Sequence, residues 1–343
     1  MIIRLKKDSA ANNVKALFDY LNEKNIAWHE VVNQKLVVLP KINSIELPQQ
    51  LTCVETTYPI STHYKLASNN WKSKTVIDVN GVEIGGDLFN IMAGPCSVEN
   101  EDQIFQTAEF LASLGVKFIR GGAYKPRTSP YSFNGLGTQG LKLLKKAAQQ
   151  YNLRVVTEVL DLSVLDEVAE HSDVLQVGSR NMHNFYMLRM LGKTNKPVLL
   201  KRGFQAKVVE WLLAAEYILS GGNEKVILCE RGVRSFDPSS RNLLDLGVVP
   251  LIKELSHLPI IIDPSHGTGS ANRVIPASMA AAAIGAHGVL VEVHPNPQQA
   301  LSDSDQAITF SQFKELLVNT QLLLNALGKH TDTESTILNS VRL

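Results

Sequence analysis

Residues 197–232 read PVLLKRGFQAKVVEWLLAAEYILSGGNEKVILCERG. Two short apolar runs, 197–203 and 225–232, enclose a segment at 208–219 whose apolar residues recur at helical spacing. Continuous rather than alternating apolar strands are typical of parallel strands that are covered on the outside by helices. The stretch therefore predicts one strand–helix–strand unit.

The same unit recurs along most of the chain. Eight apolar runs follow one another: FNIMAG (89–94), KFIRG (117–121), LRVVTE (153–158), DVLQVG (173–178), PVLLKRG (197–203), KVILCERG (225–232), PIIIDPSH (259–266) and GVLVEVH (288–294). Helical patterns lie between them, for example at 104–114, 140–150, 208–219 and 277–284. Eight units in about 240 residues predict an α/β fold, a closed (β/α)8 TIM barrel. An open, doubly wound sheet is the alternative, but the number of units favours closure.

The first 70 residues carry a different pattern, that of a small ferredoxin-like α+β domain with the order βαββαβ. The expected elements are a strand at 2–5, a helix after Ser9, strands at 28–32 and 36–39, a short helix at 44–51 and a strand at 53–57. Asn80-Gly81 is a two-residue turn signal and predicts a hairpin. We expect a domain at 1–70, a linker and hairpin at 71–88, the barrel at 89–330 and a polar tail without assigned role at 331–343.

Composition excludes several classes of protein. The chain has 343 residues, of which 44% are apolar, and a formal net charge of +1, so it lacks the basic footprint of a nucleic-acid-binding protein. No run approaches the roughly 20 apolar residues of a membrane helix. Three widely spaced cysteines argue against a disulfide framework and favour the reducing cytoplasm.

Charged residues follow almost every predicted strand. Because the C-terminal strand ends of such a barrel meet at one mouth, these side chains are expected to converge there. Six of them are cations, namely Arg120, Lys125, Arg127, Arg180, Lys201 and Arg231. Their mutual repulsion requires anionic ligands, and their number predicts two anionic substrates, at least one bearing a carboxylate and a phosphate. Such crowding is also expected to lower the pKa of Lys125 or Lys201, which would make either a proton donor.

A second set at the strand ends has the chemistry of metal ligands. Its members are Cys96, His266, Glu292 and Asp303. Cys53 and Cys229 are expected to be ordinary buried residues, whereas Cys96 lies in a Gly-Pro turn at the mouth. One thiolate, one imidazole and two carboxylates suit a single first-row divalent ion, with Mn, Fe, Co and Zn all open.

The strand-end motifs resemble those of 3-deoxy-D-arabino-heptulosonate 7-phosphate (DAHP) synthases, type I, β subgroup. The motifs are GPCSVE (94–99), IRGGAYKPRTSPYSF (119–133), VGSRN (177–181), PVLLKRG (197–203), ILCERGVR (227–234), IIIDPSHGTG (260–269) and VEVHPNPQQALSD (291–303). The resemblance extends from about residue 71 to 328. The small N-terminal domain resembles the ACT-like regulatory extension of some members.

The resemblance implies an aldol-type condensation of phosphoenolpyruvate with erythrose 4-phosphate that releases phosphate, the first step of the shikimate pathway to aromatic amino acids. It implies that phosphoenolpyruvate is bound by Arg120, Lys125, Arg180, Lys201 and Arg231. Erythrose 4-phosphate would be bound by Lys125, Pro126, Arg127, Thr128 and Asp263. The metal would be bound by Cys96, His266, Glu292 and Asp303, and act as a Lewis acid on the aldehyde. The residues expected to take part in catalysis are Lys125, Glu158, Lys201, Cys96 and His266.

Three alternatives remain open. The related 3-deoxy-octulosonate 8-phosphate synthases use arabinose 5-phosphate and carry a K-A-N-R-S type loop, whereas K-P-R-T at 125–128 favours the four-carbon sugar. A Schiff-base aldolase would use Lys201 and need no metal. A non-catalytic amino-acid sensor would lack some strand-end residues, and none is missing.

Regulation and assembly are expectations from the resemblance alone. Tyrosine or phenylalanine is the expected feedback inhibitor, with the small domain placed over the barrel mouth. Deletion of residues 1–70 would then leave an active barrel that the inhibitor no longer affects. A cytoplasmic homotetramer is expected, with no nucleic-acid or membrane partner.

Overall fold

The computed structural model describes residues 1–127 and 129–333, and it contains a closed parallel barrel. Its strands are β7 (Leu88–Gly94), β8 (Phe118–Arg120), β9 (Arg154–Glu158), β10 (Val174–Val177), β11 (Val198–Lys201), β12 (Val226–Glu230), β13 (Ile260–Ile262) and β14 (Gly288–Glu292). Each pairs with the next, and β14 pairs in parallel with β7, from Gly288 opposite Asn90 to Glu292 opposite Gly94. All eight apolar runs thus form strands, and the predicted TIM barrel is confirmed.

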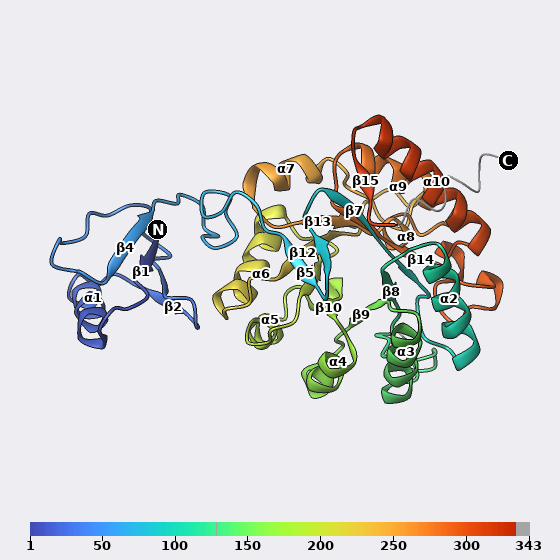
Figure 1. Cartoon of the computed structure of the whole chain (residues 1–343), viewed down its shortest axis with the longest axis horizontal. Coiled ribbons are helices and arrows are strands. Elements are labelled where there is room, and N and C mark those ends of the chain that lie inside the picture. The colour runs from blue at the N-terminus through green and yellow to red at the C-terminus, as the bar shows by residue number, and fades with distance from the viewer. Residues whose placement is uncertain (128, 334–343) are drawn as a thin grey trace.

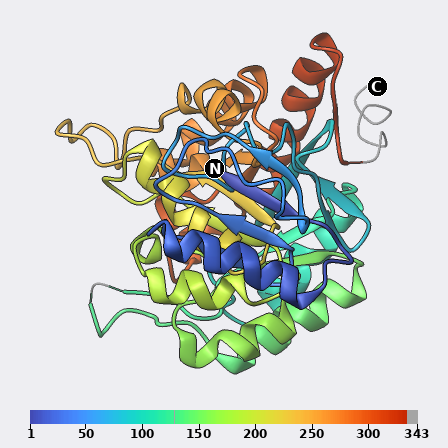
Figure 2. The ribbon, with the colours of Figure 1, turned by 90° about the vertical axis from the view of Figure 1, so that its left-hand side faces the viewer.

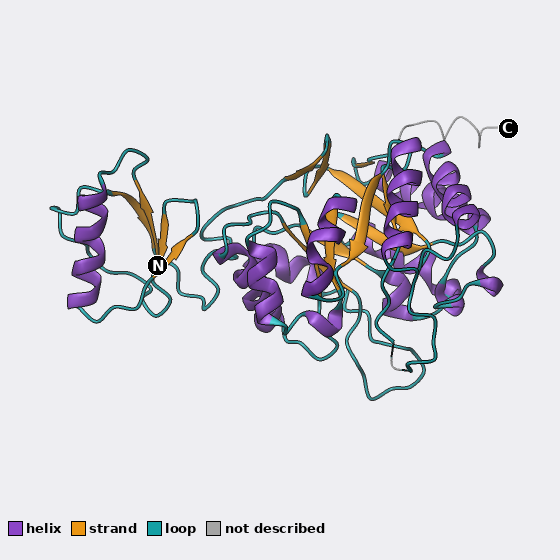
Figure 3. Ribbon diagram, turned by 90° about the horizontal axis from the view of Figure 1, so that it is seen from below, coloured by secondary structure: helices purple, strands orange, loops and turns teal. Residues whose placement is uncertain are grey.

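Helices surround the strands (Figures 1 and 3). They are α2 (Glu101–Ser113), α3 (Thr138–Gln150), α4 (Leu165–His171), α5 (Phe185–Gly192), α6 (Val208–Ser220), α7 (Val248–Leu255), α9 (Ala271–Ala283) and α10 (Phe310–Ala326). The predicted start of α9 after Pro276 is wrong, because the helix begins at Ala271 and includes that proline. Among the described residues, no helix is long and apolar enough to cross a membrane.

A hairpin closes one end of the barrel. Its strands β5 (Ile77–Val79) and β6 (Val82–Ile84) pair antiparallel around the predicted Asn80-Gly81 turn. Ile77, Val79 and Ile84 are buried in one cluster with side chains from the barrel interior, including Met92 and Phe118. Since the hairpin seals the N-terminal ends of the strands, the opposite, C-terminal end is left as the mouth.

The N-terminal segment forms a small α+β unit. It contains β1 (Ile2–Leu5), α1 (Ala11–Glu23), β2 (His29–Val31), β3 (Leu36–Val38) and β4 (Val54–Tyr58), with sheet order β2-β3-β1-β4. The short helix predicted at 44–51 is wrong, because this segment is irregular. Pro48 restricts the residue before it to extended backbone, and Leu47 and Leu51 pack against the unit's core without helical structure.

This unit packs against the barrel through its sheet, while α1 covers the outer face of the sheet (Figure 2). Gln34 Nε2 donates a 2.7 Å hydrogen bond to Gly222 O, and His29 lies 3.4 Å from Ser220 O. Ser220 ends α6 and Gly222 lies between α6 and the start of β12, at the end of the barrel remote from the mouth. The expected position over the mouth of its own barrel is therefore wrong for this chain.

Candidate active site

The predicted site residues that the structure describes lie at the mouth. Cys96 follows β7, Arg120 ends β8 and Lys125 follows it, Glu158 ends β9, Arg180 follows β10, Lys201 ends β11, Arg231 follows β12, Asp263 and His266 follow β13, and Glu292 ends β14 with Asp303 after it. Parallel strands that end at one level bring these side chains together, although they span about 200 residues of sequence. Thr128 lies outside the described residues.

Cys96, His266, Glu292 and Asp303 form one cluster, whose ligand atoms all lie within 4.8 Å of one another. Cys96 Sγ lies 3.2 Å from Asp303 Oδ2, and His266 Nε2 lies 3.4 Å from Glu292 Oε1 and 3.8 Å from Asp303 Oδ2. Ligand atoms around a tetrahedral first-row ion, with bonds of about 2.0–2.3 Å, are separated by roughly 3.3–3.8 Å. The four side chains therefore enclose a space that fits one ion.

A short helix, α8 (Pro264–Thr268), presents His266 to this cluster. Asp263 is its N-cap, and Oδ1 accepts a 2.9 Å hydrogen bond from His266 N. Asp263 Oδ2 lies 2.8 Å from His266 Nδ1. A carboxylate at this nitrogen favours the proton there and leaves the Nε2 lone pair facing Glu292 and Asp303, as in many metal-binding histidines.

The acids of the cluster are held in their charged form. Burial opposes ionisation of Asp303, but His266 and Arg241 outweigh it and lower the pKa to about 2. Burial likewise opposes ionisation of Glu292, and His266 and Arg120 lower its pKa below the usual range. Burial, followed by Glu292, raises the pKa of Cys96 to about 12. The thiol is thus protonated unless a cation such as a bound metal stabilises the thiolate.

Two of the predicted cations adjoin the cluster. Arg120 is buried, and its NH1 group donates to Glu292 Oε1 at 3.0 Å and to Pro95 O at 2.7 Å. The Nε atom of Arg120 is buried without a hydrogen-bond partner among the described residues, so one donor remains for a ligand. Lys125 Nζ donates to Cys96 Sγ at 3.0 Å and to Cys96 O at 3.1 Å.

The expected lowering of the pKa of Lys125 is wrong. Burial does act to lower the pKa of this ammonium group, and Arg120 adds to the effect. Cys96, Glu292 and Glu158 outweigh both, and the net shift is upward. Cations and anionic groups therefore alternate at the mouth. Counting the six cations in the sequence could not show this arrangement.

A second group of cations surrounds an aromatic ring that the sequence analysis missed. The guanidinium carbons of Arg231 and Arg180 lie 4.8 Å and 5.7 Å from the centre of the Phe204 ring. Arg234 adds a third guanidinium at 5.2 Å. Burial lowers the pKa of Arg231, and Asp263 opposes this only partly. The ring orients the arginines without neutralising them, so they remain available to an anion.

Asp263 contacts both a cation, Lys201, and a metal ligand, His266. Its Oδ2 atom lies 2.5 Å from Lys201 Nζ, and both residues are buried. Lys201 and His266 together hold the pKa of Asp263 well below its usual range, against the effect of burial. The carboxylate therefore positions one cation and one metal ligand at the same time.

The remaining predicted residues lie around these groups. Glu158 accepts a 3.3 Å hydrogen bond from Gln176, and a Cβ on Gly178 would lie 2.1 Å from its Oε1, so a larger residue at 178 would displace the Glu158 carboxylate. Arg127 Nε donates to Phe133 O at 2.9 Å within the 125–133 loop. Its NH2 group also donates to Leu301 O at 3.3 Å.

Two further residues hold the metal ligands and were not predicted. Gln306 Nε2 donates to Glu292 Oε2 at 2.6 Å, and Arg241 NH1 donates to Gln306 Oε1 at 2.5 Å. Arg241 also lies 3.4 Å from Asp303 Oδ1. The sequence marks site residues only by their position directly after a predicted strand, and neither Gln306 nor Arg241 has that position.

The closed barrel, the four-ligand cluster and the surrounding cations define a metal-dependent barrel enzyme for anionic substrates. The chain belongs to the DAHP synthetase I family, whose family profile matches residues 66–326. The resemblance stated from the motifs is thereby confirmed.

Named relatives agree with this family. A phospho-2-dehydro-3-deoxyheptonate aldolase of Thermotoga maritima is 48% identical over 96% of this chain and 99% of its own. The crystal structure of the Thermotoga maritima enzyme superposes with a TM-score of 0.79 at 46% identity, covering 96% of this chain and 98% of that one. A 2-dehydro-3-deoxyphosphooctonate aldolase of Francisella tularensis subsp. holarctica is 34% identical over 68% of this chain and 91% of its own.

Proposed function

We propose that this protein condenses phosphoenolpyruvate with erythrose 4-phosphate, giving 3-deoxy-D-arabino-heptulosonate 7-phosphate and phosphate as the first step of the shikimate pathway. The observation that carries the proposal is the contact of Lys125 with the metal cluster at Cys96 Sγ, 3.0 Å away. This contact joins the phosphate-binding loop to the position where an aldehyde would be polarised. The 34% identity to the octulosonate relatives is lower and covers less of the chain.

Phosphoenolpyruvate is assigned to Arg120, Lys125, Arg180, Lys201 and Arg231. The free Nε of Arg120 and the guanidinium groups around Phe204 supply donors for a carboxylate and a phosphate, which arginine binds in bidentate fashion. Holding both anions in one arrangement supplies effective molarity to the reaction.

Erythrose 4-phosphate is assigned to the 125–128 loop, with Arg127 and Thr128 at its phosphate. Pro126 makes the loop stiff between Lys125 and Arg127, because proline fixes its own backbone angle. Asp263 is the proposed acceptor of a sugar hydroxyl, which would share oxygens already bound by Lys201 and His266.

The cluster of Cys96, His266, Glu292 and Asp303 would hold one divalent ion of the Mn, Fe, Co or Zn class, which acts as a Lewis acid on the aldehyde oxygen. C3 of phosphoenolpyruvate attacks the aldehyde carbon, water adds to C2, and phosphate leaves with cleavage of the C2–O bond. Lys125, Lys201 and Glu158 are the proposed groups for the proton transfers, because Lys125 and Lys201 are assigned to the substrate and Glu158 lies close enough to Lys125 to raise its pKa.

Several finer points belong to the same proposal. We assign the enzyme to the cytoplasm as a homotetramer, with tyrosine or phenylalanine as the feedback inhibitor that binds through the N-terminal unit. That unit contacts the end of its own barrel opposite the mouth. Inhibition would therefore require either that the unit moves to the mouth or that it acts on the mouth of a neighbouring subunit.

The acceptor sugar tests the proposal. Consumption of phosphoenolpyruvate is followed with erythrose 4-phosphate or arabinose 5-phosphate as the second substrate. The proposal expects kcat/KM to be at least tenfold higher for the four-carbon sugar. A preference for arabinose 5-phosphate would overturn the assignment of the 125–128 loop and favour the octulosonate reaction.

A further inference from the structure

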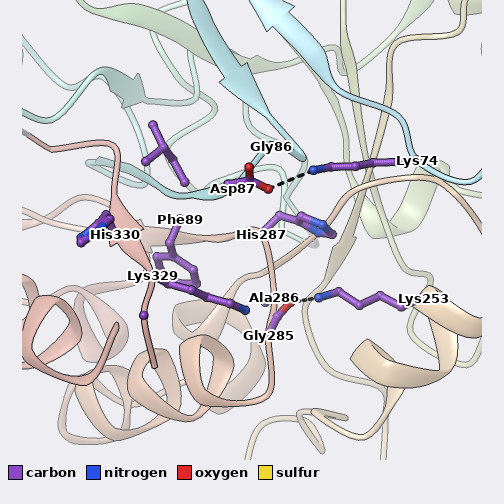
Figure 4. A pocket seen from close by; sticks show the side chains of 12 residues that line it. Lys74, Gly86, Asp87, Phe89, Lys253, Gly285, Ala286, His287, Lys329 and His330 are labelled. Atoms are coloured by element: carbon purple, nitrogen blue, oxygen red, sulfur yellow. Dashed lines mark hydrogen bonds and ion pairs between the residues drawn. The ribbon is translucent and has the colours of Figure 1, made fainter. Parts of the chain in front are cut away.

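A pocket of about 450 Å³ lies at the end of the barrel opposite the mouth (Figure 4). The segments before β7 and β14 line it, together with α7 and the turn after α10. None of its lining residues belongs to the site described above. The volume lies within the range of small-molecule sites, roughly 300–1,000 Å³.

Positive charge dominates this pocket. Three lysines line it, Lys74, Lys253 and Lys329, against the single carboxylate of Asp87. Lys74 Nζ lies 3.1 Å from Asp87 Oδ1, but the Asp87 side chain is 99% exposed, so this ion pair neutralises little. At least two of the ammonium groups are therefore left without a countercharge in the pocket.

The two other ammonium groups converge on a glycine. A Cβ on Gly285 would lie 3.1 Å from Lys253 Nζ and 3.8 Å from Lys329 Nζ, so both groups face the space that the missing side chain leaves. Lys253 Nζ also donates a hydrogen bond to Gly285 O. Burial lowers the pKa of Lys253, and repulsion from Lys329 and Lys74 lowers it further. Like charges held this close are stabilised by an anion between them.

His287 adds a neutral donor between the lysines. Its Nδ1 lies 3.1 Å from Ile260 N and 3.3 Å from Ile260 O. Because Ile260 N can only donate, the shorter contact favours an unprotonated Nδ1 and the proton on Nε2. Burial, followed by Lys253, lowers the pKa of His287 to about 4, so the ring is uncharged at neutral pH. Phe89, which is buried, and Leu88 give the pocket an apolar wall beside these donors.

We infer that this pocket binds the phosphate group of a small ligand, with Lys253, Lys329 and the Nε2–H of His287 as its donors. A dianion matches the two uncompensated ammonium groups, and phosphate accepts several hydrogen bonds at once. The pocket is larger than a phosphate ion, so an organic phosphate would place its carbon portion against Phe89 and Leu88. The site is separate from both substrate phosphates because it lies at the opposite end of the barrel.

The test titrates the full-length, metal-loaded protein with inorganic phosphate and, separately, with glycerol 3-phosphate, by calorimetry. No phosphoenolpyruvate is added, because it is itself an organic phosphate and would compete for the pocket. Four proteins are compared: wild type, Lys253→Met/Lys329→Met, Lys329→Glu and the control Lys142→Met. Lys142 is exposed on α3, outside the pocket, and the phosphate sites at the mouth are the same in all four.

Besides phosphate binding at the mouth, we expect one further binding event in wild type and Lys142→Met. This event should weaken at least tenfold in the double variant and in Lys329→Glu, while turnover stays unchanged. Tighter binding of glycerol 3-phosphate than of inorganic phosphate would identify an organic phosphate as the ligand; equal binding would identify the phosphate group alone. Identical titrations of wild type and Lys329→Glu would overturn the site. The Lys329 side chain has no hydrogen bond among the described residues, so Lys329→Glu keeps the test valid if the double variant does not fold.

Discussion

Cys96 is the residue on which the metal assignment depends most. Replacement by serine exchanges a soft ligand for a hard hydroxyl at the same position. Loss of a residue that only hydrogen-bonds a metal ligand weakens metal binding by roughly 10- to 100-fold. We expect Cys96→Ser, which changes a ligand itself, to weaken binding of the divalent ion by more than this. Competition with a chromogenic chelator measures this without any assay of turnover.

Cys53→Ser is the matched control, because Cys53 is equally buried but lies in the N-terminal unit. It should leave the affinity for the ion unchanged. Equal affinity in Cys96→Ser and wild type would show that the thiol is not a ligand.

Phe204 makes a separate prediction at the residue scale. Its ring lies beneath Arg231 and Arg180, and each cation–π contact contributes about 0.5–2 kcal/mol. We expect Phe204→Leu to raise KM for phosphoenolpyruvate by about 3- to 10-fold, with a smaller change in kcat, because the arginines lose their fixed orientation. Steady-state kinetics with phosphoenolpyruvate varied would measure the effect.

Phe185→Leu serves as the comparison, since Phe185 stacks on Tyr217 between α5 and α6 and is not one of the residues placed at the site. It should leave KM unchanged. A kcat that falls while KM stays constant in Phe204→Leu would argue against a role in orienting the binding arginines.

The sequence could predict the charged site residues because the topology of the barrel carries every strand end to the mouth. Phe204 and Gln306 escaped prediction, because an aromatic or an amide side chain in a loop has neither a period nor a spacing that marks it. The direction of the pKa shift at Lys125 also escaped, since it depends on how close Glu158 and Glu292 lie in space. The sequence therefore predicts which charged residues lie at the site, whereas the way in which their charges offset one another is seen only in the structure.

At the scale of elements, the eight strands were predictable because each is a continuous apolar run. The errors fall where proline conflicts with tertiary packing. Pro276 lies inside α9 because the helix continues against the barrel wall despite the missing hydrogen bond. Pro48 and the contacts of Leu47 and Leu51 keep the 44–51 segment irregular, although its composition suits a helix.

Asp332 makes a pH-dependent contact directly after the strand β15 (His330–Thr331), which pairs with β7. Burial raises the pKa of Asp332 to about 7, although hydrogen bonds from Asn90 and Ile91 N oppose the rise. A carboxyl whose folded-state pKa lies above its unfolded value stabilises the fold fully below about pH 4 and loses this contribution as the pH rises through about 7.

We therefore expect the free energy of unfolding to fall between pH 5 and pH 8, by about 1–4 kcal/mol from this group, and Asp332→Asn to flatten that dependence. Urea unfolding at the two pH values measures it. Asp19→Asn, a change at an exposed position on α1, should keep the wild-type slope. The same slope in Asp332→Asn and wild type would show that another group titrates.

At the scale of the whole molecule, the N-terminal unit is attached at the closed end of the barrel. The Glu216 carboxylate on α6 accepts backbone hydrogen bonds from Lys65, Leu66 and Ala67 at 2.8–2.9 Å. Lys65, Leu66 and Ala67 follow the N-terminal unit in the chain, so a variant cut before them should keep these hydrogen bonds to the barrel. A truncated form of the Thermotoga maritima enzyme superposes on 78% of this chain with a TM-score of 0.74.

We expect a variant that lacks residues 1–59 to keep its turnover and to lose inhibition by tyrosine or phenylalanine. The reason is that the site residues all lie in the barrel, whereas the proposed regulatory contacts do not. Initial rates with and without each amino acid test this. A truncated variant that tyrosine or phenylalanine still inhibits would remove the regulatory role of the N-terminal unit.

Phosphate release from phosphoenolpyruvate and erythrose 4-phosphate, measured first after treatment with a chelator and then after Mn²⁺ is restored, distinguishes a metal-dependent condensation from a Schiff-base reaction. We expect chelation to abolish turnover and Mn²⁺ to restore it in wild type but not in Cys96→Ala. Full turnover by the chelated enzyme, with borohydride trapping a substrate adduct on Lys201, would instead show a Schiff-base aldolase.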